Sequence, residues 1–197
     1  MDEVRTIRAF GNWLFFLAVG ALAVSGAVLA VDQRWGAATR LIAMAVILLW
    51  ARRARVPMIF LGVCALSVLV ATWAAVWRWY PAVPHLDTVV YVLTVGSLAA
   101  VGYLLLANAR LLPDVRDVDG TCPAWAPVLW VAMVGTTTAV LWEYYEWVLE
   151  QVSPQGVIVG YTDTVADLLA GMSGSVAAGF LTLWWVRRRA GRGVEHS

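Results

Sequence analysis

Lysine is missing from this chain, and all 14 of its basic residues are arginine. Charged residues of either sign are also scarce, at 14% of 197 residues, whereas soluble domains contain about a quarter. The formal net charge is only +1, and no basic patch interleaved with aromatic residues occurs. This charge pattern argues against a nucleic-acid partner.

Cysteine is nearly absent as well. The two cysteines, Cys64 and Cys122, are too few for a disulfide framework or a structural zinc site. Cys64 lies in an apolar run and Cys122 in a polar connection, so we expect two unpaired thiols.

Apolar residues make up 61% of the chain and gather in long runs. Crossing the hydrocarbon of a bilayer takes about 20 apolar residues in a helix, and six runs approach this length. No linker, low-complexity segment or internal repeat separates them. We therefore predict an all-α, polytopic membrane protein with one domain over residues 1–197. Its six transmembrane helices are expected at about 10–31, 36–50, 56–77, 88–108, 125–149 and 162–186.

The arginines are distributed unevenly over the connections between these helices. Only Arg34, Arg40 and Arg78 fall on one side of the membrane, and the other eleven fall on the side of the termini. Those eleven lie at the N-terminus, at 51–55, at 109–124 and in the C-terminal tail. Since basic residues are retained on the cytoplasmic side, we expect both termini in the cytoplasm.

The stretch "LWEYYEWVLE", residues 141–150, ends the fifth predicted helix on the outer side. Glu143, Glu146 and Glu150 are spaced i, i+3 and i+7, which places them on one helical face. Glu150 is expected to reach interfacial water. An acid at the bilayer centre costs about 2.5–3.5 kcal/mol, and the C-terminal half of a helix disfavours negative charge. Glu143 and Glu146 therefore need a partner.

The start of the sixth helix supplies two more acids, Asp163 and Asp167, at i and i+4. Small side chains continue this face and allow close approach of helix backbones in a bilayer. We expect the fifth and sixth helices to be antiparallel neighbours, with Glu146 and Asp167 pointing into one shared site. The small residues expected against the fifth helix are Gly171, Gly174 and Ala178.

A third contribution comes from the start of the fourth helix, with His85, Asp87 and Tyr91. Only Arg78 and His85 are available to neutralise the acids of this outer level, so we expect a divalent cation, shared protons or a cationic substrate group. Mg²⁺ prefers oxygen ligands. The candidate metal ligands are Glu143, Glu146, Asp163, Asp167, Asp87 and His85.

Structural roles are the alternative for these residues. Asp87 stands where a helix N-cap belongs, and a negative charge at Asp163 is favoured by the dipole of the sixth helix. Protonated acids bonded to neighbouring hydroxyl groups could also be purely structural.

The elements "WEYYEW" (142–147) and "YTDTVADLLAGMSGS" (161–175) resemble the paired signature of the YjdF-like bacterial inner-membrane proteins, which are distantly similar to VanZ-like proteins. The resemblance covers residues 78–185 and implies a multi-pass protein of the bacterial cytoplasmic membrane. The positions that it marks are Trp142, Glu143, Glu146, Trp147, Asp163, Thr164 and Asp167.

One position departs from the family pattern. Where the family commonly has a histidine one turn after an aspartate, this chain has Tyr91 after Asp87, and His85 lies on the other side of the aspartate. Either His85 substitutes from another angle or the site lacks an imidazole.

Three functions fit these features. The first is a metal-dependent enzyme that acts on a phosphate-bearing lipid or polyprenyl substrate through Glu143, Glu146, Asp163 and Asp167, with Mg²⁺ or another divalent cation polarising a phosphoryl oxygen. No nucleophile is recognisable for it. The second is a proton- or cation-coupled transporter or lipid flippase, although the chain lacks the repeats and broken helices of many transporters. The third is a structural or assembly protein. The partners expected in each case are membrane lipids, and in the first a lipid-linked substrate.

The arginine distribution makes the topology testable. A reporter fused after Arg55 or after Arg189 is expected in the cytoplasm, and one inserted near Gln155 outside, because eleven arginines lie on the side of the termini and three on the other. Paired phosphatase and fluorescent-protein fusions measure this. An external reporter at Arg189 would reverse the orientation of the whole chain.

Overall fold

The computed structural model describes residues 2–114, 123–152 and 160–194, with side chains described from residue 5 to residue 188 of these ranges. Cys122 and Gln155, which entered the sequence analysis, lie outside them. The described residues form helices and no strands, so the predicted all-α fold with six helices is confirmed. The helices are α1 (Asp2–Val31), α2 (Trp35–Ala51), α3 (Met58–Val76), α4 (Leu86–Asn108), α5 (Ala126–Val152) and α6 (Tyr161–Val194).

Five of the helices are long and apolar enough to cross a membrane, and α2 is a shorter apolar helix of 17 residues. At 1.5 Å per residue, α2 is about 26 Å long. The largest differences from the predicted ends are at α1, which begins at Asp2, and at α6, which continues to Val194. The apolar runs predict only the part of each helix in hydrocarbon, whereas polar and basic residues continue the helix beyond it.

Three of the helix ends have the same backbone geometry. Gln33, Arg78 and Arg110 follow α1, α3 and α4 with φ values of 59°, 57° and 60°. In each case the next residue donates its N–H to a carbonyl five residues back: Arg34 to Leu29 at 2.8 Å, Trp79 to Ala74 at 2.8 Å and Leu111 to Leu106 at 2.9 Å. This pattern satisfies carbonyl groups that the end of a helix leaves without a partner. It stops each helix without glycine or proline.

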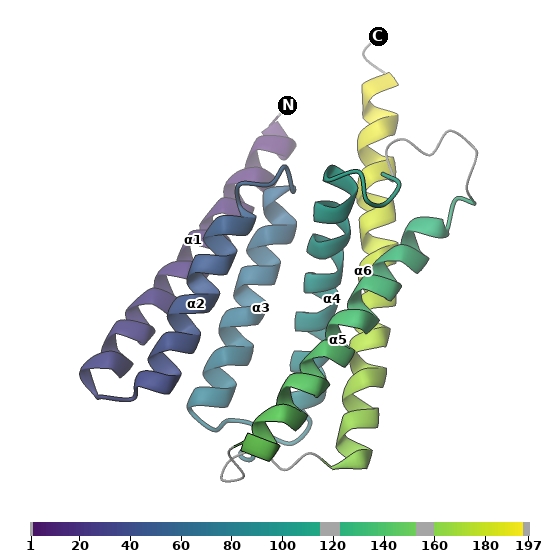
Figure 1. Ribbon diagram of the computed structural model, residues 1–197. Coiled ribbons are helices and arrows are strands. Elements are labelled where there is room, and N and C mark those ends of the chain that lie inside the picture. The colour runs from purple at the N-terminus through teal and green to yellow at the C-terminus, as the bar shows by residue number, and fades with distance from the viewer. Residues whose placement is uncertain (1, 115–122, 153–159, 195–197) are drawn as a thin grey trace. The chain divides into compact units, whose positions relative to one another are not determined.

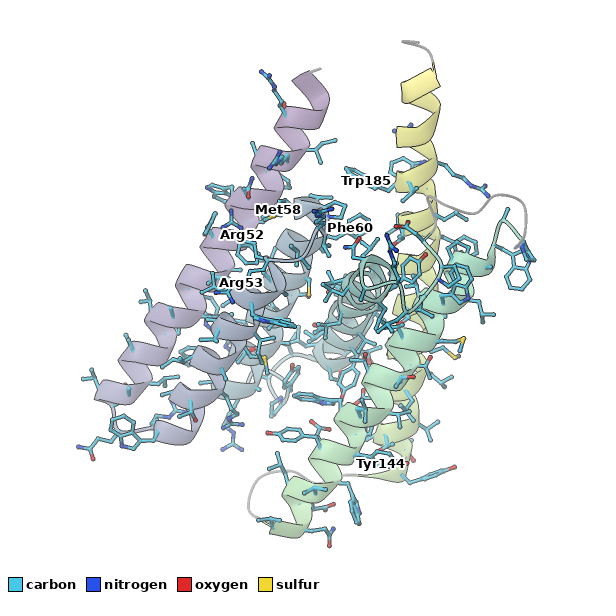
Figure 2. All side chains as sticks on the ribbon, turned by 45° about the horizontal axis from the view of Figure 1, so that its top comes forward. Arg52, Arg53, Met58, Phe60, Tyr144 and Trp185 are labelled. Atoms are coloured by element: carbon cyan, nitrogen blue, oxygen red, sulfur yellow. The ribbon has the colours of Figure 1, made fainter. Side chains whose placement is uncertain are left out.

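The chain divides into two compact units, residues 1–86 and 87–197. In the first unit, α1 contacts both α2 and α3 (Figure 1). A Cβ on Gly11 would lie 2.6 Å from the backbone of Met58 and Ile59, so α1 and α3 approach backbone to backbone. Trp73 Nε1 also donates a hydrogen bond to Ser25 Oγ at 3.2 Å. Where α2 ends, the Arg52 guanidinium lies 4.5 Å from the ring centroid of Phe16 on α1 (Figure 2).

The second unit contains α4, α5 and α6, which alternate in direction so that α4 and α6 begin where α5 ends (Figure 1). The predicted antiparallel contact between α5 and α6 is present. The expected partner of Gly174, however, was wrong. A Cβ on Gly174 would overlap the carbonyl oxygen of Val92, and one on Gly96 would lie 2.6 Å from Gly174 O, so this glycine faces α4.

The reason is that α6 has two small faces. Gly174 lies against α4 and Gly179 lies against Val128 of α5. A stripe of small residues indicates close approach but does not say which neighbour approaches. The expectation of a single domain stays a prediction.

The α4–α6 contact can be tested with one methyl group. Gly174→Ala is expected to lower stability by about 1–3 kcal/mol, because the added carbon has no space and the backbones must separate. Gly20→Ala, with nothing within 4 Å of the new Cβ, is the matched control and is expected to stabilise by about 0.5–1 kcal/mol through helix propensity. Thermal unfolding in detergent measures both. Equal stability of the two variants would contradict the close contact.

Candidate functional site

Tyr91 connects α4 to α5 near the end of the second unit where α4 begins and α5 ends. Its hydroxyl group donates a hydrogen bond of 3.0 Å to Glu143 Oε1. Tyr91 lies five residues after α4 begins, and Glu143 nine residues before α5 ends, so the antiparallel arrangement brings them to the same level. Glu143 is only 7% exposed. The most deeply placed acid of "WEYYEW" therefore points into the unit.

Two further carboxylates lie around the same tyrosine. Tyr91 interacts electrostatically with Glu146 and Asp167 as well as with Glu143. Both additional carboxylates are within side-chain hydrogen-bonding reach of Tyr91. Asp167 is 7% exposed, and Glu146 is half-buried. Glu143, Glu146 and Asp167 thus converge on Tyr91.

This arrangement has more acceptors than donors. A tyrosine hydroxyl has one hydrogen to donate, whereas each ionised carboxylate only accepts. Tyr91 can therefore serve one of the three acids at a time. Trp142 is a further side-chain partner of Glu146, one turn back on α5. For Asp167 the side-chain donor recorded among the described residues is again Tyr91, so the three acids share few donors.

The described arginines of this unit lie at its opposite end. Arg187 donates to the carbonyl oxygen of Ala124 at 3.2 Å, and the Arg188 guanidinium lies 4.4 Å from the ring centroid of Trp184. Arg187 is twenty residues along α6 from Asp167, which corresponds to about 30 Å of helix. Arg110, just beyond the end of α4, is about 28 Å along the chain axis from Tyr91. Within the unit, these cations are too distant to pair with the acids.

The remaining predicted site residues take different positions. Asp163 lies in the first turn of α6 and is exposed, but it interacts electrostatically with both Glu146 and Asp167. Asp87 lies in the first turn of α4, where its Oδ1 accepts the Thr88 N–H at 2.8 Å. Asp87 is therefore the second residue of α4 and not the N-cap that the sequence predicts, although a negative charge in this first turn is still favoured by the helix dipole. It also interacts with Asp167.

His85 is exposed and has a φ of 60°. It belongs to the first unit, whereas the three acids belong to the second.

The predicted metal site lacks geometric support. Among the described residues, no group of three or more His, Cys, Asp or Glu has an arrangement that could hold a metal ion. The carboxylate atoms of Glu143, Glu146 and Asp167 are oxygens, which suit Mg²⁺ chemically. The six candidate ligands and the bound Mg²⁺ stay predictions.

Sequence reasoning gave Tyr91 no role of its own and treated it only as a replacement for a family histidine. The signal for a role was its position, one turn after Asp87 at the level of the acids. The i, i+4 spacing of Trp142 and Glu146 was a second signal that was not used. Tyr91 and Trp142 each contribute a hydrogen-bond donor to a set of residues that is otherwise acidic.

Removing the hydroxyl group tests the contact between α4 and α5. Tyr91→Phe is expected to lower stability by about 1–3 kcal/mol, because the buried Glu143 carboxylate loses its donor. Tyr144→Phe is the matched control: this neighbour of Glu143 is 63% exposed (Figure 2), and a surface change usually has an effect within about 0.5 kcal/mol. Thermal unfolding in detergent gives both values. A Tyr91→Phe variant as stable as the control would show that Glu143 does not depend on this bond.

Comparison with known proteins identifies a family, and the description of that family names no activity. No curated protein and no solved structure matches the chain. A family model described as "Predicted membrane protein (DUF2238)" matches residues 11–189, which is most of the chain and includes α2–α5 and most of α1 and α6. The protein is therefore a multi-pass membrane protein that belongs to this family of YjdF-like proteins, as its Trp-Glu-x-x-Glu-Trp and Asp-Thr-x-x-Asp-Leu elements indicated.

Proposed function

We propose that this protein binds a cationic group of a membrane-borne ligand at Glu143, Glu146 and Asp167, in the outer half of the cytoplasmic membrane of a bacterium. One observation carries the proposal: the Tyr91 hydroxyl group donates to Glu143 and interacts electrostatically with Glu146 and Asp167, so one hydroxyl group serves a set of three carboxylates. Burying a carboxylate without a partner is costly, by several kcal/mol even after relaxation. Protons occupy the site when the ligand is absent, and a cation replaces them when it binds.

The ligand class that fits best is a primary ammonium. Such a group has one positive charge and three N–H donors, like a lysine side chain. It can donate to the carboxylates that Tyr91 leaves unserved, chiefly Glu146 and Asp167. A quaternary ammonium has the charge but no N–H to donate. A phosphate group would be repelled unless a metal ion bridged it to the acids. The lipids of this class are those with an ethanolamine head group.

The three functions named from the sequence differ in what they require. The metal-dependent enzyme requires ligands that converge on one centre, and the described residues do not supply such a group. A transporter or flippase also uses acids that take up protons or cations, so it shares the binding step proposed here. A structural role requires only that the acids stabilise the fold. Binding of a ligand distinguishes the first two functions from the third.

The experiment uses a hydrophobic carbodiimide, which reacts with protonated carboxylic acids in apolar surroundings. The protein is reconstituted in nanodiscs of ethanolamine lipid or of choline lipid, and the modified residues are found by mass spectrometry. In choline lipid, modification is expected at Glu146 or Asp167. In ethanolamine lipid, at least a threefold slower modification is expected, because the primary ammonium occupies the site.

Variants identify the residues responsible. Glu146→Gln and Asp167→Asn are nearly isosteric and are each expected to abolish the difference between the two lipids while the protein stays folded. Glu150→Gln, near the end of α5, is the control and should retain the difference. Equal modification in both lipids would contradict ammonium binding. No modification in either lipid, together with unchanged or higher stability of both variants, would favour the structural role, since a neutral amide costs less to bury than a carboxylate.

A further inference from the structure

We infer that the acidic site opens at one end only, because the interior of the α4–α6 unit beneath it is closed by successive layers of small side chains. The inference rests on the proposed function for what the site binds, but the closed layers stand on packing alone. The closed layers lie in the space enclosed by α4, α5 and α6. A ligand that reaches the site through the interior of this unit must then enter and leave at the end where α4 and α6 begin.

The first closed layer lies one helical turn below the acids. At a spacing of four residues along each helix, this layer contains Val95 on α4, Ala139 on α5 and Gly171 on α6. A Cβ on Gly171 would lie 3.2 Å from Val95 Cγ1 and 3.3 Å from Ala139 Cβ, so even one methyl group would be tight there. Val95 is 6% exposed and Ala139 is 0% exposed. These three residues meet without room for a water molecule between them.

The second closed layer lies another turn further in and contains Ala99, Gly135 and Ser175. A Cβ on Gly135 would lie 2.7 Å from Ala99 Cβ and would overlap Ser175 Oγ. Ala99 and Ser175 are both 0% exposed. The only hydroxyl group of the layer, on Ser175, donates to the carbonyl oxygen of Gly171 at 2.7 Å. Its hydrogen is therefore already bonded within α6.

Large residues fill the next level. Tyr103 and Val131 are 0% exposed, and the Tyr103 ring stacks on Trp130 with 6.1 Å between the ring centroids. The Tyr103 hydroxyl group donates to the carbonyl oxygen of Pro113 at 2.9 Å. Thr182 is also 0% exposed and donates to the carbonyl oxygen of Ala178. Each of these hydroxyl hydrogens is thus directed to a backbone carbonyl oxygen.

Opening the interior would require the three helices to separate. At Gly96 and Gly174 the backbones of α4 and α6 are in direct contact, and at Gly135 α5 is in contact with both neighbours. Closely packed interiors do not widen gradually. The packing therefore favours a site that is loaded and emptied from one membrane face over a conduit through this unit.

Cysteine accessibility tests the closed layers without relying on what the carboxylates bind. In a Cys64→Ala, Cys122→Ser background, Asp163→Cys places a thiol at the exposed start of α6. Val95→Cys places one in the first closed layer, where the smaller side chain fits without overpacking. Sealed vesicles of both orientations are treated with a membrane-impermeant, charged methanethiosulfonate, and the modified fraction is measured by mass spectrometry.

Modification of Asp163→Cys is expected from one side only, and its rate should exceed that of Val95→Cys by at least a hundredfold from either side. Modification of Val95→Cys from the side opposite to Asp163→Cys would overturn the inference, because reagent would then have passed the lower layers. Comparable rates for the two variants would also overturn it. Loss of the carbodiimide difference between lipids, with Val95→Cys still protected, would contradict the proposed ligand and leave the closed interior intact.

Discussion

The backbone contact between α4 and α6 is the constraint on which the acidic site depends. At Gly96 and Gly174 neither helix has space for a side-chain carbon. Tyr91 and Asp167 lie about one and two turns from this contact on their own helices, so their positions follow from it. A larger residue at either glycine would move Tyr91 away from the acids of α5 and α6. The chemistry of the site is therefore set by residues that have no functional group.

The acids and the tyrosine show how a membrane changes the role of a hydrogen bond. In water, three neighbouring carboxylates would be screened and solvated. Inside a bundle, each carboxylate must take up a proton or accept hydrogen bonds from the few groups around it. Tyr91 supplies one hydrogen to Glu143, so Glu146 and Asp167 are the two acids to which we assign the proposed ligand.

Much of the fold could be predicted because hydrocarbon imposes a simple rule on sequence. The six apolar runs correspond to the six helices, and the antiparallel contact of α5 with α6 follows from their short connection. The site was only partly predictable. The i, i+3 spacing of Glu143 and Glu146 places both on one face, but spacing cannot reveal that a tyrosine on α4 lies opposite. Nor can it distinguish the face of α6 that meets α4 at Gly174 from the face that meets α5 at Gly179. Those choices depend on how three helices fit together, which no single segment contains.

The tight glycines also affect how mutational data on this family should be interpreted. Gly135 has Ser175 on one side and Ala99 on the other, so almost any replacement there will remove functional protein from the membrane. A survey that scores only activity will give Gly135 the same weight as Asp167. A substitution at Gly135 adds volume where there is no space, whereas Asp167→Asn removes a charge. Measuring the abundance of each variant beside its activity separates the two. Under the proposed function, losses at Glu146 and Asp167 will not follow abundance, whereas losses at the glycines will.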